Sequence, residues 1–184
     1  QVDPRISIRF IDTGFHFPET LRFMEELARR FTLNISACRT RLPAEEIERL
    51  TREHAAHPID DRYCCGEYKI EATERALAGL RCWITGVMRE EAVTRKDTPF
   101  VEVLESGLTK VAPIAAWSAQ QIYAYMKEHR LPFHPLWAAG YTSVGCALHT
   151  QRPVDPNEPR SGRWAGQKTE CGIHDIGKPK RNTK

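Results

Sequence analysis

The chain has 184 residues, of which 41% are hydrophobic and 28% charged, and its formal net charge is +3. This composition is typical of one globular domain and excludes disordered, collagen-like and coiled-coil proteins. No apolar run approaches the roughly 20 residues that cross a bilayer, and no secretory leader is visible, so we expect a cytoplasmic protein with no membrane partner. Residues 151–184 carry eight basic and four acidic side chains. Such a segment can bind an anion or nucleic acid or be solvated. Its terminal lysines lack interleaved aromatic residues, and we expect no nucleic acid partner.

Strands and helices are predicted to alternate along the chain. Short β-branched and aromatic runs predict strands at 6–11, 33–37, 82–85, 101–104 and 110–112. Apolar spacing and capping residues predict helices at 18–31, 43–54, 67–78 and 118–128, and an ordered loop beyond 131. This alternation predicts an α/β fold with a mostly parallel sheet flanked by helices. Ligands of such sheets bind outside the carboxyl ends of the strands, where residues 12–14 and 86–95 are expected.

Six cysteines in an intracellular chain favour metal or redox chemistry over a disulfide framework. Cys38 and Cys82 lie in apolar stretches, where buried and inert thiols are expected. Cys64-Cys65 together with Cys146-Ala-Leu-His149 can enclose a metal ion or an iron–sulfur cluster. Adjacent cysteines reach two irons of one cluster more easily than one tetrahedral zinc. Zinc and unmetallated thiols are the alternatives.

The C-terminal segment combines a thiol with cationic side chains. Cys171 lies between Lys168 and His174, and nearby cations activate a thiol by lowering its pKa. The alternative is an idle cysteine in a mobile tail. Arg160 and Arg163 surround a small turn that suits capture of phosphate or sulfate, and a solvated loop is the alternative. Lys69 and Arg95 lie near the predicted edge of the sheet and are candidate anion-binding residues for the same reason, with ordinary surface residues as the alternative.

Several short motifs occur in a fixed order. They are Ile11-Asp-Thr-Gly-Phe-His-Phe-Pro-Glu-Thr20, Cys64-Cys65, Trp83-Ile-Thr-Gly86, Arg89-Glu-Glu91, Thr94-Arg95, Gly140-Tyr-Thr-Ser-Val-Gly-Cys146, Arg160-Ser-Gly-Arg-Trp164 and Glu170-Cys-Gly-Ile-His174. Over residues 6–174 this ordered set resembles the assimilatory adenylyl-sulfate / phosphoadenylyl-sulfate (APS/PAPS) reductase family. Each motif alone is short, but the ordered set is highly specific.

The resemblance implies a reaction and the residues that carry it. Cys171, supported by His174, would attack the sulfur of adenylyl sulfate, release AMP and keep an S-sulfocysteine. Thioredoxin or glutaredoxin would then reduce this adduct and release sulfite. The resemblance assigns substrate binding to Lys69, Arg95, Arg160, Arg163, Asp12, Thr13 and Gly14. Guanidinium groups suit this task, because thiolate and phosphosulfate are both anionic and repel each other.

The resemblance also implies a 4Fe-4S cluster held by Cys64, Cys65, Cys146 and His149. His149 stands where the family has a cysteine, and the three matching cysteines favour adenylyl sulfate as the substrate. One alternative is 3′-phosphoadenylyl sulfate. The other is a non-catalytic remnant that binds nucleotide or metal, with zinc on the same four residues. Tyr68 and Met88 also depart from the family, which often has arginine at these positions.

The family fold is an adenine-nucleotide alpha-hydrolase-like α/β domain. Its N-terminal strand and its Ser-x-Gly-x-x-Asp-Ser phosphate loop would precede Ile6, so we expect the chain as given to lack both. We expect residues 1–150 to form the sulfonucleotide-binding α/β domain, which would then be N-terminally incomplete. Residues 151–184 would form a C-terminal segment with the anion-binding arginines, Cys171 and a mobile tail. Homo-oligomerisation is left open.

Overall fold

A computed structural model describes residues 3, 5–56, 68–166, 168, 170, 172–173 and 176–177. Four predicted site residues lie outside these ranges: Cys64, Cys65, Cys171 and His174. The chain forms two compact units, Gln1–Ala76 with His134–Ile173, and Leu77–Phe133 with His174–Lys184. The expected boundary at residue 150 divides the chain by its motifs and stays a prediction.

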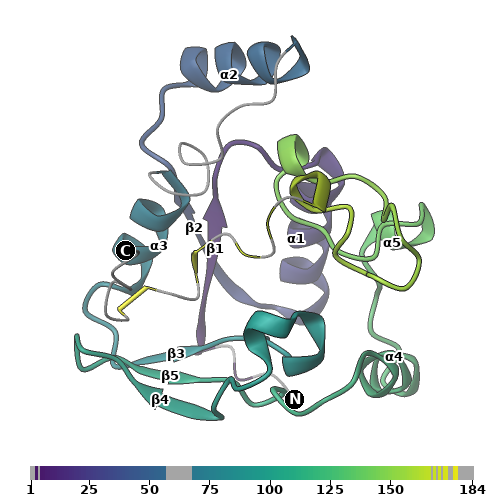
Figure 1. Ribbon diagram of the computed structural model, residues 1–184. Helices are drawn as coiled ribbons and strands as arrows, with labels where there is room; N and C mark the ends of the chain where they lie inside the picture. The colour runs from purple at the N-terminus through teal and green to yellow at the C-terminus, as the bar shows by residue number, and fades with distance from the viewer. Residues whose placement is uncertain are drawn as a thin grey trace, which may run out of the picture. The chain divides into compact units, whose positions relative to one another are not determined.

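The first unit is built on a β-α-β segment. Strand β1 (Ser7–Asp12) pairs in parallel with β2 (Asn34–Arg39), in a register that runs from Ser7 opposite Asn34 to Asp12 opposite Arg39. Helix α1 (Pro18–Phe31) connects the two strands (Figure 1). Proline suits the first turn of a helix, because it needs no hydrogen-bonded N–H there. The parallel pairing places the end of β1 at the carboxyl edge of the pair.

The core of the first unit joins segments that are distant in the sequence. Helices α2 (Ala44–Ala56), α3 (Lys69–Leu77) and α5 (Pro135–Ala138) belong to it, as do the 3-10 turns η4 (Ala147–His149) and η5 (Trp164–Gly166). Phe15 after β1, Leu50 on α2 and Trp164 in η5 form a buried cluster, against which Cys146 and Leu148 pack. Burial of this apolar surface therefore brings the C-terminal segments to the end of β1.

The second unit contains a three-stranded sheet in the order β3-β5-β4. Strand β3 (Cys82–Ile84) runs parallel to β5 (Thr109–Val111), and β4 (Val101–Val103) runs antiparallel to β5. Helix α4 (Ala119–Glu128) follows, and the 3-10 turns η2 (Arg89–Glu91) and η3 (Val93–Arg95) come after β3. Ser118 caps α4 by accepting a hydrogen bond from the Gln121 N–H at 3.1 Å. This confirms the predicted N-cap.

The two faces of the three-stranded sheet differ in burial. Lys110 is buried, and its Nζ lies 4.9 Å from the centre of the Trp83 ring on the neighbouring strand. Residues one position away point to the opposite face, because side chains alternate along a strand. On that face Ile84 is exposed, and so is Cys82. The expectation of a buried Cys82 thiol is therefore wrong, because the apolar stretch around it has one exposed face.

The predicted α/β class is confirmed, and the predicted helices and strands agree with the structure to within a few residues. Among the described residues, helix α5 was not predicted, because it lies where an ordered loop was expected beyond residue 131. Pro135 begins it, and His134 Nδ1 caps it by accepting from the Leu136 N–H at 3.2 Å. None of the helices in the described ranges has the length and apolar character needed to cross a membrane.

Candidate active site

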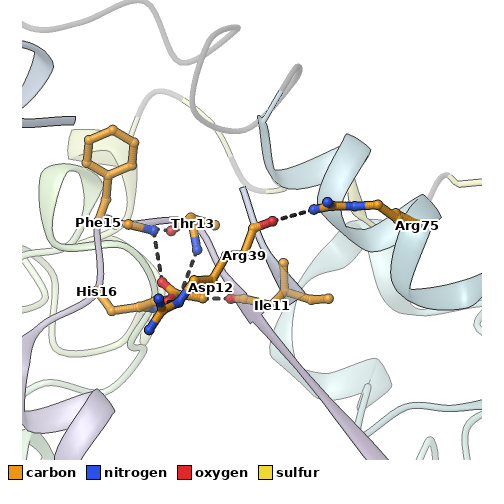
Figure 2. A network of polar contacts seen from close by, with 8 residues as sticks. Ile11, Asp12, Thr13, Phe15, His16, Arg39 and Arg75 are labelled. Carbon is orange, nitrogen blue, oxygen red and sulfur yellow. Dashed lines mark hydrogen bonds and ion pairs between the residues drawn. The ribbon is translucent and has the colours of Figure 1, made fainter. Parts of the chain in front are cut away.

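The last residue of β1 and the loop after it hold three of the predicted substrate-binding residues. Asp12 Oδ1 accepts a hydrogen bond from the Gly14 N–H at 3.0 Å, and Asp12 Oδ2 lies 3.3 Å from Arg39 Nε (Figure 2). Thr13 is buried. Gly14 has a φ of +78°, and a Cβ there would lie 2.5 Å from Ile47 Cδ1, so the loop requires glycine. Asp12 thus shapes this loop, and its contact with a nucleotide stays a prediction.

His16 is a residue of this loop to which the sequence interpretation assigned no role. Its Nε2 lies 2.9 Å from the carbonyl oxygen of Ile11 (Figure 2). The Thr13 N–H lies 3.4 Å from the same ring nitrogen, so two backbone groups at the end of β1 contact Nε2. His16 Nδ1 is buried and has no hydrogen-bond partner among the described residues. The His16 backbone also forms a β-bridge with Cys146. His16 therefore connects the end of β1 to the segment that carries the first cysteine of the Cys-x-x-His motif.

Cys146 and His149, two of the four predicted cluster ligands, stand at the start and end of one 3-10 turn. The Cys146 carbonyl accepts hydrogen bonds from Thr150 Oγ1 at 2.8 Å and from the His149 N–H at 3.2 Å. His149 is only 8% exposed, and its ring meets the His54 ring of α2 edge to face at 4.9 Å. Residues three apart on such a turn come close together. A half-buried thiol and a buried imidazole are donors that fit a metal or a cluster.

The full ligand set extends beyond the described residues, because Cys64 and Cys65 lie outside them. Within the described ranges, no group of three or more His, Cys, Asp or Glu side chains is placed to hold a metal ion. Helix α2 ends at Ala56, two residues after His54, and the segment with the two cysteines follows it in sequence. Two of the four expected ligands, Cys146 and His149, thus have surroundings that suit a metal centre, and the complete set of four stays a prediction.

The Arg160–Trp164 turn is packed into the first unit. Arg163 is only 5% exposed, and its guanidinium carbon lies 4.5 Å from the centre of the Trp164 ring. Arg163 also forms a β-bridge with Thr150. A Cβ at Gly145 would overlap the Arg163 guanidinium, so the guanidinium lies directly on that backbone. The alternative of a solvated loop is therefore wrong, because the turn is held by burial and stacking.

Arg160 connects this turn to the C-terminal segment. Its Nη1 donates to Ser143 Oγ at 3.3 Å, and its Nη2 lies 4.0 Å from Glu170 Oε2. Both charged side chains are largely buried, with 17% and 18% exposed. Lys168 Nζ lies 5.9 Å from the centre of the Trp164 ring. Glu170 directly precedes Cys171 in the sequence, so one neighbour of the predicted nucleophile lies at Arg160.

The residue after Cys171 lies against the start of α3. Gly172 has a φ of +77°, and a Cβ there would lie 3.4 Å from Ile70 Cδ1. Ile70 directly follows Lys69, the half-buried first residue of α3. The two sequence neighbours of Cys171 therefore lie against the segments that carry Arg160 and Lys69. Glycine is required at position 172 by its left-handed backbone.

Arg95 belongs to the second unit, where it ends η3. It forms an ion pair with Glu91, and its side chain is only 11% exposed. The alternative of an ordinary surface residue is therefore wrong, because Glu91 holds this guanidinium inside the unit. Both residues lie in the segment after β3. The expectation that this segment shares one edge with residues 12–14 involves both units and stays a prediction, as does the role of Arg95.

The family model for the phosphoadenosine phosphosulfate reductase domain matches residues 1–152. The chain belongs to this family. This match confirms the resemblance, and relatives named as reductases confirm the expected enzyme class. The adenosine 5′-phosphosulfate reductase of Rhodococcus opacus (strain B4) is 38% identical over 176 residues, which are 95% of this chain and 71% of that protein. The phosphoadenosine 5′-phosphosulfate reductase of Gloeobacter violaceus is 38% identical over 179 residues, 95% of this chain and 74% of that protein.

Solved structures agree with the family. The phosphoadenylyl-sulfate reductase of Candida auris, crystallised as a phosphate complex, has a TM-score of 0.67 and 26% identity, and the match covers 79% of this chain and 71% of that one. The FMN adenylyltransferase of Candida glabrata has a TM-score of 0.59 at 16% identity, covering 79% of this chain and 44% of that one, which shows a shared fold only. These reductases and nucleotide enzymes share the α/β fold expected from the sequence.

Proposed function

We propose that the protein reduces adenylyl sulfate to sulfite and AMP in sulfate assimilation. The Cys171 thiolate attacks the sulfur, the bond between sulfur and the phosphate oxygen breaks, and AMP leaves with the electron pair. The sulfonate stays on Cys171 as S-sulfocysteine. A dithiol reductant of the thioredoxin or glutaredoxin class then becomes a disulfide, while Cys171 returns to the thiol and sulfite leaves. Such a reaction belongs in the cytoplasm, where dithiol reductants are kept reduced.

The observation that carries this proposal is the placement of the two neighbours of Cys171. Glu170 lies at Arg160, and Gly172 lies at Ile70, next to Lys69. A thiol near cationic side chains has a lowered pKa and is more often ionised at neutral pH. The same cations reduce repulsion between the thiolate and an anionic substrate. We therefore assign both tasks to Arg160 and Lys69, with Arg163 and Arg95 as further anion-binding residues and His174 as support for Cys171.

The loop at the end of β1 supports the binding of a nucleotide. In open parallel sheets, ligands bind beyond the carboxyl ends of the strands, and Asp12, Thr13 and Gly14 stand there in the first unit. The Gly14 N–H donates a hydrogen bond to the Asp12 carboxylate, which stabilises the turn of this loop. We assign these three residues to the nucleotide and the arginines to the sulfonate end of the substrate.

The cofactor of the proposed enzyme is a 4Fe-4S cluster on Cys64, Cys65, Cys146 and His149. When bound, the cluster would cross-link two distant segments, as structural metal centres do. His16 and Thr150 hold the Cys146 turn through its backbone, and His54 packs on His149. These contacts fix the two described ligands independently of the cluster.

The reaction is tested by mixing the full-length protein with adenylyl sulfate and measuring bound sulfonate by intact mass. We expect one sulfonate on Cys171, which added thioredoxin releases as sulfite. Cys171→Ser should form no adduct, whereas Cys38→Ser, a matched control on β2, should behave like the wild type. Turnover by Cys171→Ser would refute the mechanism.

Reduction of 3′-phosphoadenylyl sulfate is the second candidate function, and two observations favour it. His149 replaces a thiolate at the cluster, and the Gloeobacter violaceus relative is a phosphoadenosine 5′-phosphosulfate reductase. The same adduct assay with 3′-phosphoadenylyl sulfate decides between the substrates by the ratio of their kcat/KM values. A colourless protein with stoichiometric zinc and no adduct from either nucleotide would instead identify a non-catalytic remnant.

A further inference from the structure

Arg160 already has an anionic partner in the free protein. Glu170 Oε2 lies 4.0 Å from its Nη2, on the residue directly before Cys171. Charge-assisted hydrogen bonds between arginine and carboxylate are about 2.7–2.9 Å long, so this pair is in loose contact. Ser143 Oγ accepts a hydrogen bond from the other terminal nitrogen of Arg160, Nη1, at 3.3 Å. Two partners therefore orient Arg160, the Ser143 hydroxyl and the Glu170 carboxylate. Another anion can take the place of the carboxylate.

A sulfonate and a carboxylate compete for the same donors of a guanidinium. Both present negatively charged oxygens that accept N–H hydrogen bonds. Because both Arg160 and Glu170 are largely buried, their attraction is screened less than at the surface. An incoming anion therefore binds Arg160 only if it interacts with the guanidinium more favourably than the Glu170 carboxylate does. A small anion that gains nothing from nucleotide binding is at a disadvantage in this competition.

We propose that Glu170 is a positioning residue that orients Arg160 in the free protein and releases it to the sulfonate of the bound substrate. This inference rests on the proposed function, because it takes the substrate to be a sulfonucleotide. Glu170 lowers the affinity for the substrate, because its ion pair with Arg160 must break when the substrate binds. In return, the ion pair holds Arg160 next to the residue that precedes the nucleophile in the sequence, and pre-orientation of this kind accelerates the chemical step.

The first experiment separates binding from chemistry. Binding of adenylyl sulfate is measured in the Cys171→Ser background, and adduct formation is measured with Cys171 present. We expect Glu170→Gln to tighten binding by up to about fivefold, as the loss of a competing ion pair predicts. Adduct formation should slow by about tenfold or more, and Glu170→Asp should recover part of the rate. A merely structural role would weaken both quantities together.

Glu158→Gln is the matched control, because it removes the same charge from an exposed side chain of the same segment. We expect it to match the wild type in both measurements. If Glu170→Gln also matched the wild type, this inference would be overturned while the proposed function stood. If the wild-type protein neither bound nor reacted with adenylyl sulfate, the proposed function would fail and this inference with it.

The contact is also tested without any nucleotide. Trypsin cleaves after Lys168, which lies over the Trp164 ring two residues before Glu170. We expect Glu170→Gln to speed cleavage at this bond, measured by mass spectrometry. The exchanged pair Arg160→Glu with Glu170→Arg should restore protection, though not adduct formation, because Arg160 itself is needed for the sulfonate. Unchanged cleavage in Glu170→Gln would show that the pair does not order this segment.

Discussion

Gly145 and Arg163 show how one residue without a side chain makes room for a buried charge. The guanidinium of Arg163 lies on the Gly145 backbone, with the Trp164 ring 4.5 Å from its central carbon. Trp164 in turn belongs to the buried cluster of the first unit. The guanidinium therefore has apolar and backbone neighbours that hold it in place. Glycine at position 145 is required by this close approach and not by an unusual backbone angle.

Gly145→Ala should displace Arg163. Its Cβ would overlap the guanidinium, and overpacking of this kind lowers the free energy of unfolding by about 1–3 kcal/mol. Adduct formation on Cys171 should also fall, because Arg163 is assigned to the sulfonate. Gly86→Ala is the control, since a Cβ there meets Ile114 Cδ1 at an ordinary 3.8 Å. Chemical denaturation of both variants provides the measurement, and equal stabilities would contradict the close approach.

Helix α5 is an element whose stability depends on one histidine. His134 Nδ1 accepts from the Leu136 N–H at 3.2 Å, and its Nε2 lies 3.0 Å from Thr20 Oγ1 on α1. Nδ1 must be unprotonated to accept, so the neutral ring caps α5 and joins it to α1. Partial burial lowers the pKa of His134 below its ordinary value, against a smaller opposing effect of Glu19. Both observations favour the neutral form in the folded protein.

Stability should therefore fall in mild acid through His134. Its pKa is lower in the folded than in the unfolded chain, so the contribution is complete above about pH 6.5 and is lost as the pH falls through the folded pKa. His134→Asn keeps a capping acceptor without titrating. Denaturant unfolding at about pH 7.5 and about pH 5.5 should show a smaller pH dependence in this variant than in the wild type. If the stability of His134→Asn depended on pH as strongly as that of the wild type, His134 would be excluded as the source of the pH dependence.

At the scale of the whole molecule, the first unit is discontinuous in sequence. Residues 1–76 and 134–173 form it together, and residues 77–133 of the second unit lie between them in the sequence. Cys146 and His149 come from the later part, whereas Cys64 and Cys65 come from the earlier part. A centre bound by all four would cross-link the two parts of the first unit. Cross-links over long loops restrict the unfolded chain most strongly.

Removal of the metal should thus lower the stability of the whole first unit. We expect full-length protein prepared without oxygen to contain iron and acid-labile sulfide, and chelation to lower its Tm. Cys146→Ala should abolish iron binding, and His149→Cys should make the cluster more persistent in air, because a thiolate replaces an imidazole. Cys38→Ala is the control that keeps its iron. Absorption spectra and iron analysis check these outcomes, and zinc in place of iron would contradict the cluster.

Local patterns were sufficient to predict most elements. Helix α1 begins at its proline, α4 begins after its Ser118 cap, and the strands follow short β-branched runs, because these signals act between residues close in the chain. Helix α5 was missed, since its four residues lie in a segment rich in proline and glycine and its cap is a histidine. The exposure of Cys82 was also missed, because composition does not tell which face of a sheet is covered.

The sequence by itself determined the family, the α/β class and the identity of the candidate residues, because ordered motifs and hydrophobic periodicity are properties of the chain alone. Only the tertiary structure decided which of these residues meet. Arg160 and Glu170 are ten positions apart, and Gly172 reaches Ile70 from about a hundred positions away. Such meetings depend on how the core cluster of Phe15, Leu50 and Trp164 folds the C-terminal segment onto the end of β1. Long-range packing of this kind leaves no periodic trace in the sequence.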